Sequence, residues 1–472
     1  MTLRFCIRVG FASLAAAVVL VPAAAAPAGA PVRETPLGQQ QSVSIILNGA
    51  GGRQPRLAIA GVQAPAGDAT LAAAGATIAD VLWNDLNFEE EFYMIPADEA
   101  RRIPSAASVA ALPVSDWAAL GADYVLLASL SRSGDDLPVE IRVVNVSDAP
   151  RKEVFGPSSF GCHASDLRTC AHTIANRLHK ALRNVDGVAM TRLAFVSDRG
   201  GVHVAGSLDR GGKEIYISDY DGKNVQAVTA NRALNIEPAW SPDGKLLAWD
   251  SYLSGNQDVY VKSIYEVRQW RPASGGHGGA GAPANSQPAF SPDGKQIAFV
   301  SNRDGSYQIY VVDTEGRTAP RRLTAGRAYE GAPTWSPNGT QIAFTSDRLG
   351  SNTPRLFIMN ADGTSPTAEA DGGRCDRPSW SPLGDKIAFT CGSTTPYGIC
   401  AYDTRSNTTQ PLHAPDGYSY EDPVFAPNGR HIAFKTNRWG GEQIAIMDLK
   451  GNIQLRITDV GNNTYPAWAA SK

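Results

Sequence analysis

Five stretches of this chain read EPAWSPDGKLLAWD (Glu237–Asp250), QPAFSPDGKQIAFVS (Gln287–Ser301), APTWSPNGTQIAFTS (Ala332–Ser346), RPSWSPLGDKIAFTC (Arg377–Cys391) and DPVFAPNGRHIAFKT (Asp422–Thr436). Their aromatic markers lie 50, 45, 45 and 45 residues apart at Trp240, Phe290, Trp335, Trp380 and Phe425. Repetition at a period of roughly 40–50 residues is typical of stacked supersecondary units. This repeat therefore decides the architecture of the larger part of the chain.

Each repeat has the pattern of four short antiparallel strands. The second repeat continues with the apolar runs Gln296–Val300 and Gln308–Asp313 and ends with the shorter segment Arg321–Thr324. Such runs, rich in β-branched and aromatic residues, predict buried strands. The Ser-Pro-Asp-Gly segments predict tight turns, in which we interpret Asp243 and Asp293 as turn formers rather than catalytic acids. A four-stranded antiparallel sheet per repeat is the blade of a β-propeller.

The two ends of the repeat region give the number of blades. Thr191–Ser197 and Glu214–Asp219 match the second and third strands of a blade, but no first strand precedes them. A matching first strand occurs at Tyr465–Ala469, and its marker Trp468 follows Phe425 by 43 residues. We therefore expect six blades, the last assembled from two distant segments, which closes the ring and removes free edges.

The first residues have the pattern of an export signal. Arg4 and Arg8 are followed by the apolar run Val9–Val21 and by small residues in Ala23–Ala30. This order predicts a cleavable signal peptide, residues 1–26, and an exported soluble protein without a membrane span. A formal charge of −3 gives no electrostatic basis for binding nucleic acid. We expect a monomer.

The region between the signal and the repeats has a different pattern, in which predicted strands and helices alternate. Arg56–Val62, Tyr124–Ser131 and Pro138–Val146 have the pattern of strands, and Thr70–Leu86 and Ser165–Asn184 that of helices. The predicted organisation is a flexible segment at 27–44, a small α/β domain at 45–187 and an all-β six-bladed propeller at 188–472.

Cysteines and histidines suggest disulfides rather than metal chemistry. Cys162 and Cys170 are eight residues apart and are candidates for a disulfide in an exported protein, whereas the pairing among Cys375, Cys391 and Cys400 stays open. No Cys-X-X-Cys motif occurs, and the histidines lack paired ligand spacing. We interpret His172 and His179 as part of a solvated helix face and expect no metal and no cofactor.

The order of these parts resembles the TolB family. The segments that carry the resemblance are SDWAALGADYVLL (Ser115–Leu127), HTIANRLHKALRNVDGVAMTRLAFVSDR (His172–Arg199) and the closing YPAW (Tyr465–Trp468). The resemblance implies a periplasmic binding protein that maintains outer-membrane integrity and supports constriction at cell division. It implies a Pal-type peptidoglycan-associated lipoprotein bound at the mouth of the propeller channel. It also implies a TolA-type inner-membrane protein, contacted through the segment after the signal peptide and through the first domain.

The first strands of a propeller line its axis, so the residues near their starts are candidates for partner binding. They are polar and differ from blade to blade: Asn235, Glu237, Gln287, Glu330, Asp376, Arg377, Glu421, Asp422 and Thr464. Residues that read a partner should differ between blades, although surface loops also vary. We expect charge reversal at two of the charged positions to weaken binding at least tenfold without lowering the melting temperature; these positions are Glu237, Glu330, Arg377 and Asp422.

A second polar set repeats between blades: Asp198-Arg199, Asn302-Arg303, Asp347-Arg348 and Asn437-Arg438. Repetition indicates a structural role, and we expect an Asx-type turn from which the arginine bridges to a neighbouring blade.

Two other classes of protein were weighed. A propeller-bearing serine peptidase needs a hydrolase domain with a Gly-X-Ser-X-Gly elbow, and neither this elbow nor a His-Glu-X-X-His motif occurs. We therefore expect no enzyme. A paralogue that keeps the scaffold but binds another envelope protein or a glycan stays open, because scaffold and site are separable.

Overall fold

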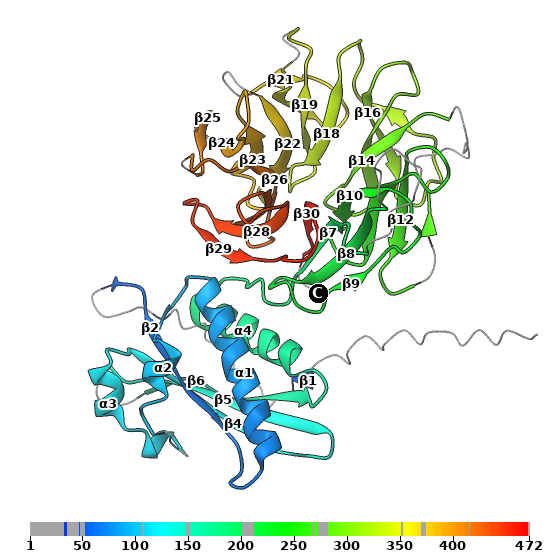
Figure 1. Ribbon diagram of the computed structural model, residues 1–472. Helices are drawn as coiled ribbons and strands as arrows, with labels where there is room; N and C mark the ends of the chain where they lie inside the picture. The colour runs from blue at the N-terminus through cyan, green and yellow to red at the C-terminus, as the bar shows by residue number, and fades with distance from the viewer. Residues whose placement is uncertain are drawn as a thin grey trace, which may run out of the picture. The chain divides into compact units, whose positions relative to one another are not determined.

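The computed structural model describes residues 33–34, 47, 52–104, 106, 108–147, 152–200, 212–266, 269–271, 282–350, 353–369, 374–413 and 415–470. In this part of the chain an α/β region is followed by a ring of β-sheets (Figure 1). The expected signal peptide, and all of the 27–44 segment except Arg33–Glu34, lie outside the described residues. No helix in the described ranges combines the length and the apolarity that a bilayer crossing requires.

The α/β region is one mixed sheet with helices on both faces. The strand order is β1-β6-β5-β4-β2-β3, with β1 Arg33–Glu34, β2 Arg56–Gln63, β3 Tyr93–Met94, β4 Tyr124–Leu130, β5 Asp136–Asn145 and β6 Lys152–His163. The helices are α1 Ala69–Phe88, α2 Ala97–Ala100, the 3₁₀ turn η2 Val109–Ala111, α3 Val114–Ala119 and α4 Leu167–Arg183.

Strand alternation divides the core of this region between the two faces of the sheet. Leu126 of β4 belongs to the cluster that contains Ile78 of α1 and residues of α4. Its neighbours Val125 and Leu127 pack with the fully buried Trp117 of α3 on the other face. Successive side chains of a strand point to opposite faces, so an almost continuous apolar run serves both layers.

The sequence does not predict β6, which is the longest strand of the sheet. It contains Gly156 and Pro157, residues that are depleted in strands, and its register with β5 shifts at two places. Gly156 has φ +97° and lies against the backbone of β5, where a Cβ atom would meet the carbonyl oxygen of Ile141 at 2.4 Å.

The interpretation of His172 and His179 as a solvated face of α4 is wrong. The two residues are 2% and 0% exposed, because α4 packs between the sheet and the β-ring. Burial, followed by the nearby Arg430 cation, lowers the pKa of His179 to about 4.

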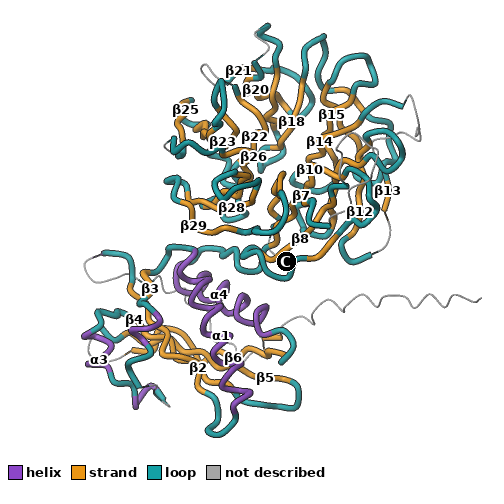
Figure 2. The backbone as a smooth tube through the Cα atoms, viewed as in Figure 1, coloured by secondary structure: helices purple, strands orange, loops and turns teal. Residues whose placement is uncertain are grey.

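Six four-stranded antiparallel sheets form the ring, and Figure 2 shows them arranged around a common axis. Five are consecutive in the chain: β10 Asn235–Trp240, β11 Leu246–Ser251, β12 Asp258–Ser263 and β13 Gln269–Trp270; β14 Asn285–Phe290, β15 Gln296–Ser301, β16 Gln308–Asp313 and β17 Arg321–Arg322; β18 Glu330–Trp335, β19 Gln341–Ser346, β20 Arg355–Asn360 and β21 Thr367–Ala368; β22 Cys375–Trp380, β23 Lys386–Cys391, β24 Gly398–Asp403 and β25 Thr408–Pro411; β26 Tyr420–Phe425, β27 His431–Thr436, β28 Gln443–Asp448 and β29 Ile453–Arg456.

The sixth sheet confirms the predicted closure of a six-bladed propeller. β30 Asn463–Trp468 pairs with β7 Arg192–Ser197, and β8 Glu214–Asp219 and β9 Gln226–Ala227 complete the blade. Antiparallel pairing joins Asn463 to Ser197, residues that are far apart in the chain. β7 thus has a partner strand on each side, β30 and β8.

The Ser-Pro-Asp-Gly segments are tight turns, as predicted. The Ser241 hydroxyl donates to Asp243 Oδ1 at 2.7 Å, and the same carboxylate oxygen accepts from the Lys245 amide at 3.1 Å. Asp293 makes the equivalent contacts in the next blade. The carboxylates of these aspartates therefore accept hydrogen bonds within the turns and stabilise them.

Four cysteines are joined in two pairs. A bond between Cys162 and Cys170 joins β6 to α4, and one between Cys391 and Cys400 joins neighbouring strands of one blade. Cys375 is buried and is not disulfide-bonded. It lies directly opposite Cys391 in the register of β22 and β23.

Buried polar contacts join α1 and α4 to the propeller. Tyr220, which follows β8, donates to Asp85 of α1 at 2.6 Å. Asn428 donates to Glu89 at 3.0 Å, and Arg430 pairs with the same carboxylate. The Phe88 ring stacks on His431 with centroids 4.4 Å apart. One continuous apolar cluster accompanies these contacts.

Candidate functional site

A β-bulge in every first strand builds the axis of the propeller. In each first strand, the residue before the proline has a positive φ between 47° and 56°. These six residues are Glu237, Gln287, Ala332, Arg377, Asp422 and Tyr465. In each blade the register between first and second strands shifts at this point. A bulge inserts one extra residue and redirects its side chain. Here it turns six different side chains toward one cavity.

These six residues, called the channel ring below, line a cavity of about 270 Å³ together with the prolines that follow them. Left-handed backbone costs a non-glycine residue on the order of 1 kcal/mol, and the cost recurs in all six blades. The proline contributes by disfavouring the right-handed helical conformation of the residue before it. The repeated x-Pro pattern thus has a structural cause.

One ion pair crosses the channel between blades that are not neighbours in sequence, and further pairs lie between neighbouring blades and within one blade. The Arg377 guanidinium pairs with Glu237 Oε1 and, through Nε at 3.1 Å, with Asp422 Oδ1. It also lies over the Tyr465 ring at 4.3 Å. Lys435 adds a pair with Glu421 at 3.3 Å on the same side. The charges of the channel ring therefore have partners within the propeller itself.

Hydrogen bonds continue this chain between blades. The Gln287 amide donates to Asp250 Oδ1 at 3.0 Å, and its side-chain oxygen accepts from the Ala332 amide at 2.7 Å. Its side-chain nitrogen reaches Glu237 at 3.5 Å. Gln287 thus contacts the blades on both of its sides.

The buried acids of this network have divergent pKa values. Burial, then the neighbouring Glu237, raises the pKa of Asp250 well above its usual range. Burial acts to raise the pKa of Glu237 as well, but the Arg377 cation together with hydrogen bonds from Asp250, Arg377 and Gln287 lowers the pKa of that carboxyl. Of the two carboxyls, Asp250 is therefore the one whose protonated form is favoured. Burial raises the pKa of Asp422 as well, against the opposing effect of Arg377.

The predicted mouth residues divide into three groups. Glu237, Gln287, Arg377 and Asp422 lie in the channel ring. Asn235, Glu330 and Thr464 are buried inside their blades at 0%, 0% and 4% exposure, so their placement at the mouth is wrong. Asn235 accepts from Ser251 Oγ at 2.7 Å, which is a contact within one blade. The physical reason is the bulge, which shifts the alternation of each first strand.

Asp376 and Glu421 lie beside the ring but do not line the cavity. Asp376 pairs with Arg374 at 3.2 Å and Glu421 with Lys435. Sequence reasoning missed Ala332 and Tyr465 as channel residues. The residue immediately before each proline was the signal that identifies them, since it selects all six positions in one step.

The repeated Asx-Arg pairs stabilise turns, and Arg199, Arg303 and Arg348 each contact the first strand of their own blade. Asn302 Oδ1 accepts from the Ala284 amide at 2.8 Å, as expected for an Asx contact. Arg303 donates to Asn285 Oδ1 at 2.9 Å, and Asn285 is in the first strand of the same blade. Arg199 and Arg348 make the same kind of contact within their blades, to Asn463 and Glu330. A bridge from these arginines to a neighbouring blade stays a prediction.

One end of the propeller carries several exposed apolar side chains. It is the end where first strands start, which the pairing of Asn235 with Ser251 places beside the turns after second strands. Large apolar residues in these turns and in the connections between blades are 40–59% exposed: Leu253, Tyr307, Leu349, Tyr418 and Val460. We call this end, defined by these five residues, the apolar face. The contacts of α1 with Asn428 and Arg430 lie on a turn at the other end.

Two domain families match this chain. The model of the TolB amino-terminal domain matches residues 43–151, and that of the TolB beta propeller domain matches residues 179–472. The chain is 33% identical over 218 residues to the Tol-Pal system protein TolB of Bordetella avium, covering 46% of this chain and 44% of that protein. It is 30% identical over 193 residues to the protein of the same name from Escherichia fergusonii, covering 41% and 43%.

The aligned part spans less than half the length of these curated relatives. Among solved structures, that of TolB from Acinetobacter baumannii superposes with a TM-score of 0.72 at 23% identity. It covers 88% of this chain and 97% of that one, so the two share a fold over nearly the whole length.

Proposed function

The chain belongs to the TolB family, and from this premise we propose that it is a periplasmic, non-catalytic binding protein of a Tol–Pal system. Its main partner is a Pal-type peptidoglycan-associated lipoprotein, which docks on the apolar face over the mouth of the channel. A TolA-type inner-membrane protein is the second partner, bound through the segment after the signal peptide and through the α/β domain. Together these contacts maintain the outer membrane and support its constriction at division.

The observation that supports the docking site is the difference between the two ends of the propeller. The apolar face has five large exposed apolar residues at the end where the first strands, which carry the channel ring, start. Apolar anchors surrounded by polar groups are typical of protein interfaces. The opposite end already contacts α1 through Asn428 and Arg430.

The channel ring itself supports this function indirectly. Because Arg377 is already paired with Glu237 and Asp422, reversing these charges disrupts the propeller as well as any partner contact. We therefore no longer expect charge reversal here to leave the melting temperature unchanged. Exposed residues of the apolar face are the better positions for a test.

The experiment is a calorimetric titration of the mature protein with the periplasmic domain of the Pal lipoprotein from the same organism. We expect saturable one-to-one binding. Leu349→Asp, at a position 59% exposed on the apolar face, should weaken it at least tenfold. Leu383→Asp is the matched control, since Leu383 is 63% exposed on a turn at the opposite end.

Three outcomes are informative. Loss of affinity with Leu349→Asp alone supports docking on the apolar face. Equal loss with both variants contradicts that location. Absence of binding by the parent protein at high micromolar concentration contradicts the Pal assignment and favours a paralogue that binds another envelope component.

A further inference from the structure

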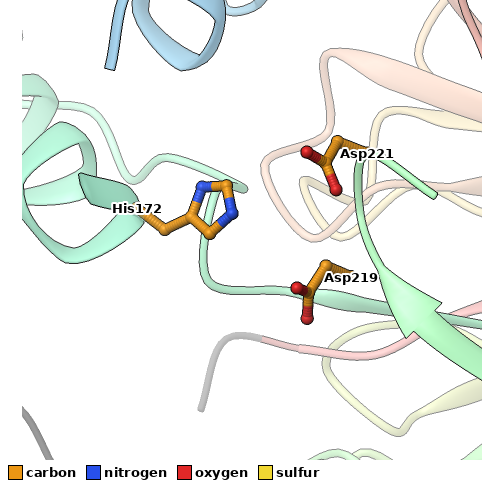
Figure 3. A group of neighbouring side chains, drawn as sticks. All are labelled: His172, Asp219 and Asp221. Atoms are coloured by element: carbon orange, nitrogen blue, oxygen red, sulfur yellow. The ribbon is translucent and has the colours of Figure 1, made fainter. Parts of the chain in front are cut away.

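A histidine and two aspartates from distant parts of the chain meet beside α4. They are His172 of α4, Asp219 at the end of β8 and Asp221 in the turn that follows. One potential ligand atom from each lies within 4.8 Å of the others, and Figure 3 shows the imidazole directed toward both carboxylates. We propose that these three side chains bind a divalent transition-metal ion, Zn²⁺ or Mn²⁺.

A hydrogen bond to Asp85 fixes the orientation of the His172 ring. Its Nδ1 lies 2.7 Å from Asp85 Oδ2, and the other oxygen of Asp85 accepts from the Tyr220 hydroxyl at 2.6 Å. A carboxylate that accepts from both neighbours places the imidazole proton on Nδ1. The lone pair is then on Nε2. Metal-binding histidines have this arrangement, with a carboxylate behind the ring that fixes its tautomer and raises its basicity.

The second observation is that His172 Nε2 is buried and has no hydrogen-bond partner. The whole residue is 2% exposed, so solvent does not readily satisfy this atom. A buried polar atom without a partner costs roughly 1–3 kcal/mol. Nε2 faces two carboxylates, which like the lone pair of Nε2 can only accept. A cation between these three acceptors removes the conflict.

The donor set suits borderline metal ions better than hard ones. One imidazole nitrogen with carboxylate oxygens is a common set for Zn²⁺ and Mn²⁺, whereas Ca²⁺ and Mg²⁺ prefer oxygen ligands alone. Asp219 accepts from Asn224 through one oxygen only, at 2.6 Å. Asp221 accepts from the Lys223 amide at 3.2 Å and pairs with Arg168. Both carboxylates keep lone pairs that a metal ion can use.

Binding requires a small closure. Ligand atoms about 2.1 Å from a tetrahedral ion lie roughly 3.4 Å from each other. Asp219 and Asp221 are only partly buried, so their side chains can rotate inward from the present spacing of up to 4.8 Å. The bound ion then connects α4 to the propeller.

The test uses the mature full-length protein after treatment with a chelator. Titration with Zn²⁺ should show one site per chain, and binding of Ca²⁺ should be at least tenfold weaker. Co²⁺ as a spectroscopic probe should give visible absorption bands that Zn²⁺ abolishes. Asp219→Asn should weaken Zn²⁺ binding at least tenfold. Asp313→Asn is the matched control, because Asp313 ends β16 as Asp219 ends β8 and belongs to no such cluster among the described residues.

A second variant changes affinity in the opposite direction. Arg168→Gln removes the cation paired with Asp221 and should tighten Zn²⁺ binding at least threefold. It also keeps the proposal testable if Asp219→Asn does not fold, as checked by near-ultraviolet circular dichroism. The proposal is overturned if the parent protein fails to bind Zn²⁺ at 100 μM, if the two aspartate variants bind equally, or if Arg168→Gln leaves the affinity unchanged.

Discussion

Replacing Arg377 by glutamine tests whether the channel ring holds the blades together. Arg377 pairs with Glu237 and Asp422, whose side chains are only 9% and 11% exposed. Removing one member of a buried ion pair costs about 3–5 kcal/mol, because the remaining charge is buried without a partner. Arg377 itself is 24% exposed toward the channel, so we expect the lower limit, about 3 kcal/mol at pH 8.

The sign of the pH dependence follows from the acids left behind. In the parent protein burial acts to raise the pKa of Glu237, but Arg377 is the largest of several opposing effects that together lower it. Without that cation, burial raises this pKa above the unfolded value. A carboxyl with a raised folded-state pKa contributes stability at low pH and loses it as pH rises through that pKa. The destabilisation by Arg377→Gln should therefore fall to about half between pH 8 and pH 5.

Urea unfolding followed by fluorescence and circular dichroism measures both quantities. The double-mutant cycle adds Glu237→Gln and the double variant, and we expect a coupling of at least ~1.5 kcal/mol. Arg303→Gln is a control, because the hydrogen bond of Arg303 to Asn285 involves a neutral amide. Additivity within ~0.5 kcal/mol, together with a pH-independent effect, would refute the role assigned to the ring.

Three other predictions concern single groups. His179 is fully buried with a pKa near 4, so its stabilising effect is complete above pH 6.5 and is lost below it. As the pH falls from 7 to 4, the free energy of unfolding of His179→Met should therefore rise by about 3 kcal/mol relative to that of the parent, as measured by urea unfolding. A difference between variant and parent that stays constant with pH would contradict this. Asp250→Asn mimics the protonated acid, so at pH 8 the variant should be at least as stable as the parent. A decrease in the free energy of unfolding of more than ~1 kcal/mol would count against a preference of Asp250 for its protonated form. Peptide mass mapping without reductant should find Cys375 as a free thiol and Cys162 bonded to Cys170, and alkylation of both partners would exclude that bond.

The sequence predicts the propeller because one local pattern is repeated and each copy obeys the same local physics. The aromatic marker, the proline turn and the apolar second strand depend on neighbouring residues only. Even the closure of β30 on β7 was predictable, since a first strand is missing at one end and present at the other. Four of the six channel-ring residues were predicted. Ala332 and Tyr465 were missed, and Asn235 and Thr464 were wrongly included, because the bulge turns the residue before each proline into the channel and leaves the start of the strand in the blade.

Contacts between distant parts of the chain lay beyond the sequence. His172 and Asp219 are 47 residues apart and have no common motif. The burial of His179 depends on packing against other elements, which helical periodicity alone does not specify. β6 was missed for a related reason, since its pairing with β5 outweighs the poor strand propensity of Gly156 and Pro157.

The closing blade also sets the order in which this molecule can be completed. β30 follows every other blade strand in chain order, yet it pairs with β7, the first. A nascent chain that lacks β30 therefore has a β7 with one bare edge and a ring that cannot close. During synthesis the propeller stays open until its last strand has emerged from the ribosome.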